Sequence, residues 1–466
     1  MKRVDDVYSL VRCEDERVTR AIAERYTFEV PGAKFDRRVR RGWWDGKVRL
    51  FEPASGLLYA GLWLDLARFC IDSGWRFEGD APQHSVHEYY LDLANDGTGR
   101  EARDYQREIF ESCLSLGRRL VVSPTGSGKS LSIYHLIRHY AEPTLVVVPR
   151  VGLVKQLAAD FVSYGMDPAR IHGVKDWDER DSDDVVIVTY QSIYKRPAAW
   201  FDKFRLVIGD EAHHFKARTL VSIMTKLKRC PHRFGFTGTL DGVNCNVATL
   251  VGLFGPVYDA ARTVDLIEDG HLSKFRIEAV VLRHPAPAEY LDYQAEMDYI
   301  CSHRGRNEFL TKLALQLGGN TLLLFQYVEK HGATLERMIR EAAGSRPVYY
   351  VHGGVDAEER ERIRLEIEDE SDAIYIASYG TLSTGVNIPK LHNLVFASPS
   401  KSRIRNLQSI GRVLRTHESK DTATLYDVAD DLSAGGRMNH TLRHFVERVK
   451  LYNEQDFEYA VHRLEV

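Results

Sequence analysis

Short runs of consecutive apolar residues, many of them β-branched, alternate with helical periodicity through most of the chain beyond residue 105. A strand that is apolar at every position is buried on both faces, which is typical of a parallel sheet covered by helices on both sides. The alternation pauses between residues 256 and 274 and then resumes, so the pattern predicts two α/β domains in tandem. The expected strands lie at residues 120–122, 145–148, 185–188 and 206–208 in the first domain, and at 321–325, 348–351, 373–377 and 394–396 in the second.

The first 95 residues follow a different pattern. They mix short apolar runs with an arginine-rich stretch and close in the turn-rich run Asn-Asp-Gly-Thr-Gly at residues 95–99. We therefore expect a small α+β N-terminal domain at residues 1–95, a first α/β domain at 96–262 and a second at 263–466. Within the last of these, residues 438–459 space apolar side chains three and four residues apart, which predicts an amphipathic C-terminal helix.

Composition excludes several classes of protein. The 466 residues are 44% hydrophobic and 28% charged, which excludes a disordered or collagen-like chain. The charges nearly cancel, to a net of -3, so any binding of nucleic acid requires a segregated basic patch. The six cysteines form no Cys-x-x-Cys pair, which disfavours a zinc site and a disulfide framework. Because the sequence shows neither a signal peptide nor a membrane-spanning run, we expect a cytoplasmic protein.

A phosphate-binding loop follows the expected strand at residues 120–122. Residues 123–130 read Ser-Pro-Thr-Gly-Ser-Gly-Lys-Ser and lead into a helical pattern, which is the setting that a P-loop requires, although Ser123 stands where the strict pattern has glycine. Lys129 can reach the β- and γ-phosphate oxygens, and the Ser130 hydroxyl can bind Mg²⁺. A chance glycine-rich turn is the alternative. The predicted ATP-binding residues of this loop are Thr125, Gly126, Ser127, Gly128, Lys129 and Ser130.

Two adjacent carboxylates follow the expected strand at residues 206–208. Asp210 comes at the carboxyl end of the strand, where a carboxylate can hold Mg²⁺ beside a P-loop. Glu211 follows it and could orient or deprotonate the attacking water. Because acidic residues also cap helices, such a pair is informative mainly when a P-loop precedes it. Together the two motifs predict an Mg·ATP site with Lys129 and Glu211 as catalytic residues.

Two arginines near the end of the second α/β domain complete the expected catalytic set. Arg412 and Arg415 are three residues apart, so a helix would present both on one face to a single anion. Arginines placed in this way stabilise the charge that develops on a γ-phosphoryl group during hydrolysis. The alternative is a solvated basic helix. A second basic run, which could contact nucleic acid or position that helix, consists of Lys401, Arg403 and Arg405.

These motifs, in this order along residues 103–415, resemble those of the superfamily-two helicases. The resemblance implies two RecA-like domains that close on Mg·ATP at their interface and reopen after hydrolysis, which moves the enzyme along nucleic acid. Asp210 to His213 match the DEAH form of the Walker B box, and Gln106 resembles the adenine-reading glutamine upstream of the P-loop. Asn387 stands where many members have a ribose-contacting aspartate. The residues that the resemblance assigns to coupling hydrolysis with movement are His213, Thr237, Gly238, Thr239 and Gln408.

Other segments resemble the motifs with which these helicases grip a nucleic acid strand. Val-Pro-Arg at residues 148–150 and Thr-Tyr-Gln-Ser at 189–192 resemble motifs Ia and Ib of the first domain. His-Gly at 352–353 with Arg360, and the run 378–387, resemble motifs IVa and V of the second. The resemblance therefore implies strand contacts by Arg150, Gln191, Ser378 and Thr381.

Within the superfamily, the chain resembles the phage recombination-repair helicases of the UvsW family. The likeness rests on Gly-Trp-Trp-Asp-Gly-Lys-Val-Arg-Leu at residues 42–50, on residues 377–385 and on residues 408–415. It implies an ATP-dependent DNA helicase or translocase that unwinds or branch-migrates forks, Holliday junctions and D-loops in recombination, repair or replication restart. It also implies a prokaryotic or phage-infected host cytoplasm, and we expect a monomer that works with recombination or single-strand-binding proteins.

Two alternatives to this function stay open. The core motifs do not distinguish deoxyribose from ribose, so the enzyme could be a helicase that acts on RNA duplexes. It could also be a translocase subunit that moves along duplex DNA without unwinding it, as the motor of a restriction complex does. Such a motor would need a partner that carries the nuclease, because no nuclease constellation is recognisable in the sequence.

A basic segment in the N-terminal domain suits a DNA junction or a duplex end. Between Lys34 and Arg49 lie seven basic and two acidic residues, a net charge of +5, with Phe35, Trp43 and Trp44 interleaved. Arginine binds phosphates bidentately, and aromatic rings stack on bases or wedge between them. The alternative is tryptophans in the core and solvated arginine side chains, and a strand would point the two tryptophans to opposite faces. The predicted DNA-binding residues here are Lys34, Arg37, Arg38, Arg40, Arg41, Trp43, Trp44 and Lys47.

Overall fold

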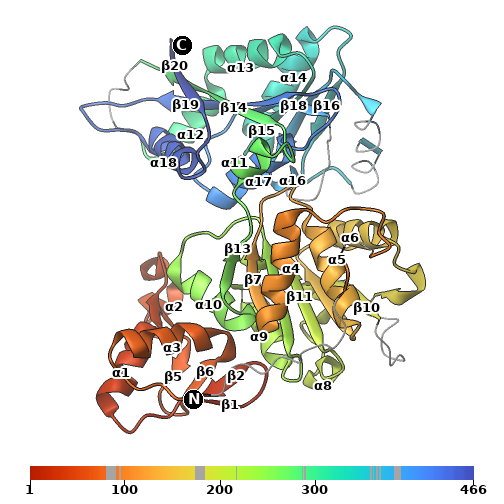
Figure 1. The fold of residues 1–466 in the computed structure, drawn as a ribbon. Coiled ribbons are helices and arrows are strands. Elements are labelled where there is room, and N and C mark those ends of the chain that lie inside the picture. The colour runs from red at the N-terminus through yellow and green to blue at the C-terminus, as the bar shows by residue number, and fades with distance from the viewer. Residues whose placement is uncertain are drawn as a thin grey trace. The chain divides into compact units, whose positions relative to one another are not determined.

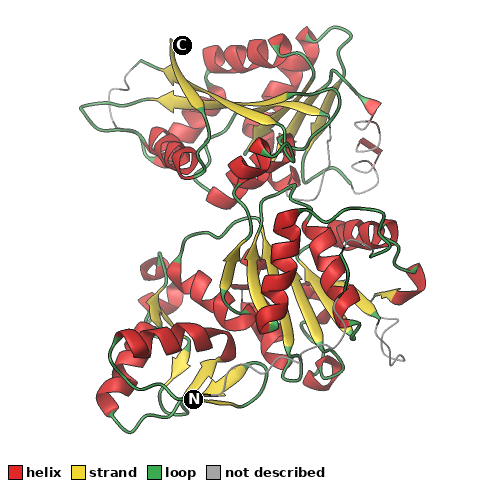
Figure 2. Cartoon of the chain, viewed as in Figure 1, coloured by secondary structure: helices red, strands yellow, loops and turns green. Residues whose placement is uncertain are grey.

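The computed structural model describes residues 1–79, 91–93, 96–173, 184–216, 218–285, 287, 290–356, 359, 362–363, 366, 369–382 and 390–466. The chain divides into two compact units. Unit 1 comprises Met1–Ser123 and Gly128–Ala261, and unit 2 comprises Pro124–Ser127 and Arg262–Val466. Figure 1 labels the elements of both units, and Figure 2 distinguishes their helices from their strands.

The N-terminal part of unit 1 is the predicted α+β region. Its core contains apolar side chains such as Ile22, Leu58 and Leu66, and the buried Tyr26 hydroxyl donates a hydrogen bond to Asp65 Oδ2 at 2.7 Å. A separate antiparallel ribbon of two strands precedes and ends the basic segment, whose last residues Lys47–Arg49 form its second strand. The strand order of the sheet is β1 (Lys2–Arg3), β2 (Tyr8–Leu10), β6 (Leu57–Tyr59) and β5 (Phe51–Glu52). The ribbon pairs β3 (Thr27–Glu29) with β4 (Lys47–Arg49). The helical elements are α1 (Glu16–Arg25), η1 (Ala33–Phe35), α2 (Arg37–Arg40), η2 (Ala60–Leu62) and α3 (Trp63–Asp72).

The rest of unit 1 contains a seven-stranded sheet in which every neighbouring pair is parallel, and all four predicted strands are confirmed. The strand that begins with His232 and Arg233 is absent from the prediction because these two residues interrupt its apolar pattern. Arg233 is nevertheless fully buried, since its guanidinium donates to three backbone oxygens at 2.8 to 3.0 Å. The strand order is β13 (Val257–Asp259), β7 (Arg118–Val122), β12 (His232–Thr237), β11 (Leu206–Asp210), β8 (Thr144–Val148), β10 (Val185–Thr189) and β9 (Ile171–His172). The helical elements are α4 (Asp104–Leu116), α5 (Lys129–Tyr140), α6 (Val151–Ser163), η3 (Pro168–Arg170), α7 (Tyr190–Ile193), α8 (Ala198–Phe201), η4 (Ala212–Lys216), α9 (Arg218–Lys226) and α10 (Asn244–Phe254).

The two parts of unit 1 pack closely against each other. A Cβ atom on Gly61 of η2 would lie 2.1 Å from the backbone oxygen of Val251 in α10, so only glycine fits at this contact. The buried Arg118 guanidinium donates to the Asp6 backbone oxygen at 2.7 Å, and the Asp6 N–H donates to the Lys228 oxygen at 3.1 Å. The N-terminal part is therefore joined to the sheet by packing and by buried hydrogen bonds.

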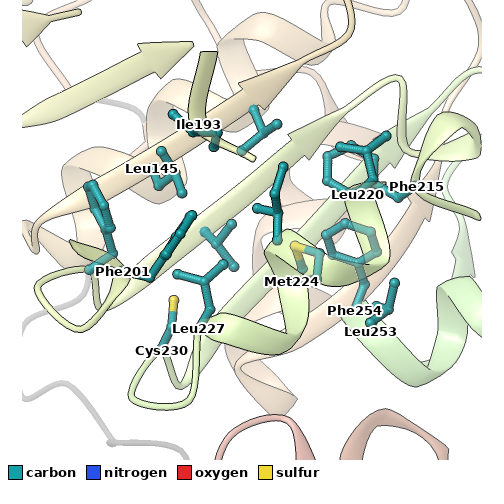
Figure 3. Close-up of a cluster of buried hydrophobic side chains, with 14 of the residues drawn as sticks. Leu145, Ile193, Phe201, Phe215, Leu220, Met224, Leu227, Cys230, Leu253 and Phe254 are labelled. Atoms are coloured by element: carbon teal, nitrogen blue, oxygen red, sulfur yellow. The ribbon is translucent and has the colours of Figure 1, made fainter. Parts of the chain in front are cut away.

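A large apolar cluster covers one face of this sheet (Figure 3). It joins strand residues such as Leu145 to Met224 of α9 and Phe254 of α10. Burying one such side chain contributes roughly 1.5 to 3 kcal/mol relative to leaving it exposed. Ala212 and Phe215, which follow the acidic pair almost directly, belong to the same cluster. The core therefore fixes the position of the residues that the sequence assigns to the ATP site.

Unit 2 contains a second seven-stranded parallel sheet, and its four predicted strands and the C-terminal helix are confirmed. Its two longest strands are absent from the prediction because charged residues interrupt them. Two of these charges, Asp427 and Asp430, are fully buried and pair with Arg448 and Arg306 at 2.7 Å. The strand order is β16 (Val348–Val351), β17 (Ile374–Ser378), β15 (Asn320–Phe325), β18 (Leu391–Phe396), β19 (Thr422–Asp431), β14 (Lys274–Arg283) and β20 (Tyr459–Glu465). The helical elements are α11 (Thr263–Glu268), α12 (Tyr293–Ser302), α13 (Arg304–Gln316), η5 (Val328–Gly332), α14 (Ala333–Ala342), α16 (Tyr379–Leu382), α17 (Arg403–Val413) and α18 (His440–Glu454).

Candidate functional site

The predicted P-loop connects the end of β7 to the start of α5. Gly128 has a φ angle of 77°, and a Cβ atom there would lie 2.7 Å from Gln106 Nε2, so the loop closes tightly onto α4. Lys129 Nζ donates to the Ser123 backbone oxygen at 3.1 Å, and Ser127 Oγ donates to the Pro124 oxygen at 2.7 Å. These hydrogen bonds hold a curled backbone at the N-terminal end of a helix, which is the arrangement that binds phosphate.

Gln106 is buried beside this loop rather than displayed on the surface. Its Oε1 accepts a hydrogen bond from the Arg103 N–H at 3.0 Å, which caps α4, and its Nε2 donates to the Gly128 oxygen at 3.3 Å. The side chain therefore ties the start of α4 to the end of the P-loop. Contact between Gln106 and adenine stays a prediction.

Asp210 and Ser130 are the residues that could hold Mg²⁺. Burial, followed by the neighbouring Glu211 carboxylate, raises the pKa of Asp210 to about 7, and the Lys129 ammonium opposes this rise. A buried carboxylate whose charged form is disfavoured in this way is stabilised strongly by a divalent cation. The Ser130 hydroxyl shares a 2.9 Å hydrogen bond with the hydroxyl of Tyr164, which follows α6. The Asp210 carboxylate and the Ser130 hydroxyl, together with their surroundings, therefore fit the binding of Mg²⁺ with ATP.

The acidic pair lies beside the predicted coupling residues. Glu211 has a φ angle of 51°, a left-handed conformation that is strained for a residue with a side chain. Its Oε2 lies 3.3 Å from His213 Nδ1, which also lies 3.0 Å from Thr237 Oγ1. Because the Thr237 hydroxyl donates to the Thr239 backbone oxygen at 2.9 Å, its oxygen accepts from His213. The structure thus brings together His213, Thr237, Gly238 and Thr239 next to Glu211.

The two predicted arginine fingers do not share one helix face, so that prediction is wrong. Arg412 lies in the last turn of α17, which ends at Val413, and Arg415 lies in a bend beyond it. The buried Lys420 ammonium donates to the Val413 oxygen at 2.7 Å, and the Ser273 N–H donates to the Leu414 oxygen at 2.7 Å. These bonds occupy the carbonyls that His417 and Glu418 would use in a longer helix, so the helix does not continue through this region. Gln408 lies half-buried on the same helix as Arg412.

The residues that the sequence assigns to strand contacts differ in exposure. Arg150 precedes α6 and is half-buried, and burial lowers its pKa while the Glu211 carboxylate opposes this shift. Gln191 is exposed on α7. Ser378 and Thr381 are buried, and their hydroxyls share a 2.7 Å hydrogen bond across the turn from β17 to α16. DNA contact by these four residues stays a prediction. Arg360 of motif IVa and the predicted ribose contact Asn387 lie outside the described residues.

The basic segment, residues 34–49, fills most of the connection between the two strands of the β3–β4 ribbon. Asp36 Oδ1 accepts a hydrogen bond from the Arg38 N–H at 2.8 Å and so begins α2. Trp43 is 70% exposed, whereas Trp44 is half-buried and its Nε1 donates to the Lys47 oxygen at 2.8 Å. The opposite burial of the two tryptophans is confirmed. The two tryptophans do not lie on a strand, however, because the chain turns at residues 41–43 and β4 begins only at Lys47.

Acidic neighbours neutralise only part of the basic segment. Within the described part of the chain, Lys34, Arg37, Arg40 and Arg41 form no ion pair. The Arg41 guanidinium carbon lies 5.1 Å from the centre of the exposed Trp43 ring, which leaves its N–H groups accessible to a phosphate. The ion pairs of the segment are Arg38 with Asp36 at 2.8 Å, Lys47 with Glu29 at 4.0 Å, and Arg49 with Asp45.

Comparison with known proteins identifies the family. A family model described as DNA helicase UvsW, N-terminal, matches residues 2–80. The models for type III restriction enzyme, res subunit, and for the helicase conserved C-terminal domain match residues 100–242 and 305–417. The ATP-dependent DNA helicase uvsW of Enterobacteria phage T4 is 32% identical over 495 aligned positions, which cover 97% of each chain. This chain belongs to the UvsW family.

A solved structure and a further relative are also similar to this chain. The crystal structure of T4 UvsW matches with a TM-score of 0.50 at 28% identity and covers 99% of this chain and 98% of that one. A DNA 3'-5' translocase XPB2 from Sulfurisphaera tokodaii is 24% identical over 74% of this chain and 84% of its own. As a UvsW-family member, the protein is an ATP-dependent DNA helicase with two tandem RecA-like domains. In the described part of this UvsW-family chain, every helix is too short or too polar to span a membrane.

Proposed function

We propose that this UvsW-family helicase hydrolyses ATP to unwind or branch-migrate branched DNA, such as forks, Holliday junctions and D-loops, during recombination, repair or replication restart. The observation that supports this specificity is the basic segment, whose four cations without described ion pairs lie beside two exposed aromatic rings. Phe35 is 67% exposed and Trp43 is 70% exposed. Cations attract the dense phosphates around a branch point, and exposed rings stack on bases that are unpaired there.

In the ATP site, the proposal assigns a role to each predicted residue. The P-loop from Thr125 to Ser130 encloses the phosphates, and Gln106 and Asn387 contact the adenine and the ribose. Ser130 and Asp210 hold Mg²⁺, which when bound neutralises charge on the phosphate oxygens. Lys129 contacts the β- and γ-phosphates, and Glu211 orients or deprotonates the attacking water. The charge that develops on the γ-phosphoryl group is stabilised by Arg412 and Arg415.

Coupling of hydrolysis to movement passes through the turn beside the acidic pair. The Glu211, His213 and Thr237 contacts support this role, because a change in the hydrogen bonding of Glu211 alters the partners of His213. The coupling set is His213, Thr237, Gly238, Thr239 and Gln408. The DNA strand is held by Arg150, Gln191, Ser378 and Thr381, and the junction by Lys34, Arg37, Arg38, Arg40, Arg41, Trp43, Trp44 and Lys47.

The wider setting is part of the same proposal. The enzyme acts as a monomer in the cytoplasm of a prokaryote or a phage-infected host, with recombination or single-strand-binding proteins as partners. The domain at residues 1–95 targets the motor, which consists of the domains at 96–262 and 263–466. The phage origin of the T4 relative supports this setting.

Stimulation of ATP hydrolysis by different nucleic acids, measured side by side at equal phosphate concentration, tests the proposal. The expected order places a fork and a Holliday junction above single-stranded DNA, and duplex RNA last. Replacing both Arg40 and Arg41 by alanine should remove the preference for branched DNA but retain stimulation by single strands. Stimulation by RNA equal to that by DNA would contradict the proposal, and equal stimulation by unbranched duplex would indicate a translocase without unwinding.

A further inference from the structure

Exposed arginines on unit 2 are mostly neutralised by a nearby carboxylate, except in one region. Arg304 pairs with Glu308 at 2.7 Å and Arg337 with Glu341 at 3.6 Å, each within one helix. Within the described part of the chain, Arg463 on β20 is one exposed arginine without such a pair, and three others lie in one region together with the exposed Lys401. These three arginines are Arg405, Arg437 and Arg443.

Tyrosine side chains, rather than carboxylates, order these guanidinium groups, and Arg443 Nη2 also donates to the Met438 backbone oxygen at 2.8 Å. The Arg437 guanidinium carbon lies 4.0 Å from the centre of the Tyr290 ring, and Arg443 Nη2 donates to the Tyr290 hydroxyl at 3.2 Å. The Arg405 guanidinium carbon lies 5.3 Å from the centre of the Tyr379 ring. A guanidinium held against a ring keeps its full charge and most of its in-plane N–H donors, so it is prepared to bind a phosphate.

The three arginines belong to one continuous surface. Tyr290, which precedes α12, lies 5.4 Å from His440, and Tyr293 of α12 lies 5.4 Å from His444, measured between ring centres. Aromatic rings therefore join this region to α18, and Figure 1 shows α12 and α18 as neighbours. Lys401 follows Ser400, whose backbone oxygen accepts a hydrogen bond from Arg448 of α18 at 3.1 Å, so Lys401 lies beside this helix. The surface thus runs from the start of α16 past the residues before α17 to the N-terminal half of α18.

The carboxylates on the same elements are engaged elsewhere. Glu296 is buried, and its two oxygens accept hydrogen bonds from the N–H groups of His440 and Thr441 at 2.7 and 2.8 Å. Glu447 pairs with Lys450 at 2.7 Å. Asp292 accepts a hydrogen bond from the Ala295 N–H at 2.8 Å and caps α12. The outward surface therefore keeps a positive charge.

The opposite face of α18 holds this surface rigid. Arg448 is buried and donates to both oxygens of Asp427, at 2.7 and 2.8 Å, and to the Ser400 backbone oxygen at 3.1 Å. The Tyr452 hydroxyl donates to the same carboxylate at 2.8 Å. Because α18 cannot rotate without breaking these buried bonds, Arg443 is presented in a fixed direction.

We propose that the surface around the N-terminal half of the C-terminal helix α18 binds a DNA strand through Lys401, Arg405, Arg437 and Arg443 together with Tyr290, of which Arg443 lies on α18 itself. The cations bind successive phosphates, and the surface extends the strand contacts predicted at the start of α16. This inference rests on the proposed function of the enzyme as a DNA motor. It assigns to α18 a role in DNA binding in addition to its packing against β19.

The test compares two double variants of the full chain that remove the same charge. R437A/R443A alters the proposed surface, whereas R304A/R337A removes two exposed, ion-paired arginines of the same unit and serves as the control. Affinity for a fluorescein-labelled oligothymidylate is measured by anisotropy over a series of salt concentrations. Each lost phosphate contact with a single strand should reduce the magnitude of the slope of log K against log salt by roughly 0.7. The slope for R437A/R443A should therefore be smaller by about 1.4, and this variant should bind the oligothymidylate on the order of tenfold more weakly at low salt.

ATP hydrolysis without DNA should be the same in both double variants and the wild-type enzyme. The proposal is overturned if the slope for R437A/R443A equals the slope for the control. It is also overturned if R437A/R443A loses affinity for duplex DNA only. If the R437A/R443A slope stays unchanged while R40A/R41A weakens junction binding, this proposal fails and the proposed function stands. If the wild-type enzyme neither binds DNA nor is stimulated by it, the proposed function itself fails.

Discussion

Replacing Tyr164 by phenylalanine removes a single hydroxyl from beside the ATP site. That hydroxyl lies 2.9 Å from Ser130 Oγ, and the ring is buried. An oxygen that binds a cation does so through a lone pair, so the proton of Ser130 needs another acceptor when the metal is bound. Tyr164 supplies that acceptor, and the variant leaves the rest of the ring packing in place.

The loss of one neutral hydrogen bond costs about 1 kcal/mol, which corresponds to a roughly fivefold weaker Kd. We therefore expect Tyr164→Phe to weaken binding of a fluorescent ATP analogue about fivefold with Mg²⁺ and not at all in EDTA. Tyr134→Phe is the matched control, because it removes another buried tyrosine hydroxyl, which contacts Arg138 at 3.0 Å. Equal Kd values for the Tyr164 variant and the wild type in Mg²⁺, or an equal loss in EDTA, would refute this reasoning.

Three further predictions concern catalysis, DNA binding and stability. Lys129→Ala or Glu211→Gln should lower DNA-stimulated ATP turnover by at least about 100-fold, measured with a coupled assay, and wild-type turnover in either variant would remove that residue from the catalytic set. Trp43→Ala should weaken binding to a forked DNA about fivefold or more through lost stacking, with Ile71→Ala, a similarly exposed apolar residue on α3, as the unaffected control. Arg448→Met should lower the free energy of unfolding of unit 2 by about 3 to 5 kcal/mol, because it leaves the buried Asp427 without its cation. A loss of free energy below about 1 kcal/mol, measured by urea titration, would argue against a structural role for this ion pair.

The sequence predicted the two parallel sheets well because eight of their strands are uninterrupted apolar runs. It failed for β12 and β19, where buried charges such as Arg233 and Asp427 break the pattern, and for β14, whose charged residues are exposed or half-buried. It also failed for β9, β13 and β20, which have no such apolar run. The buried charges of β12 and β19 are tolerated because residues outside the strand satisfy them: Arg233 donates to backbone oxygens 6 to 20 residues away, and Asp427 pairs with Arg448. Such partners cannot be recognised before the fold is known. Local pattern therefore predicted the strands that need no distant partner.

The candidate site shows the same division. The P-loop and the acidic pair are contiguous in sequence, so their chemistry was predicted residue by residue. Tyr164 lies 34 residues from Ser130, and no motif marks it. The spacing of Arg412 and Arg415 predicts a shared helix, whereas α17 ends at Val413 and bonds from Lys420 and Ser273 occupy the next carbonyls that a longer helix would use. Such contacts between remote residues depend on packing and became visible only in the structure.

Branch migration of a Holliday junction with homologous arms tests the central claim most directly. With ATP, the wild-type enzyme should convert the four-way junction into its duplex products, resolved by gel electrophoresis. With a non-hydrolysable ATP analogue, or in Glu211→Gln, the junction should be bound but not converted. An intact junction in the presence of wild-type enzyme that is hydrolysing ATP would contradict the account, and so would conversion that continues without hydrolysis.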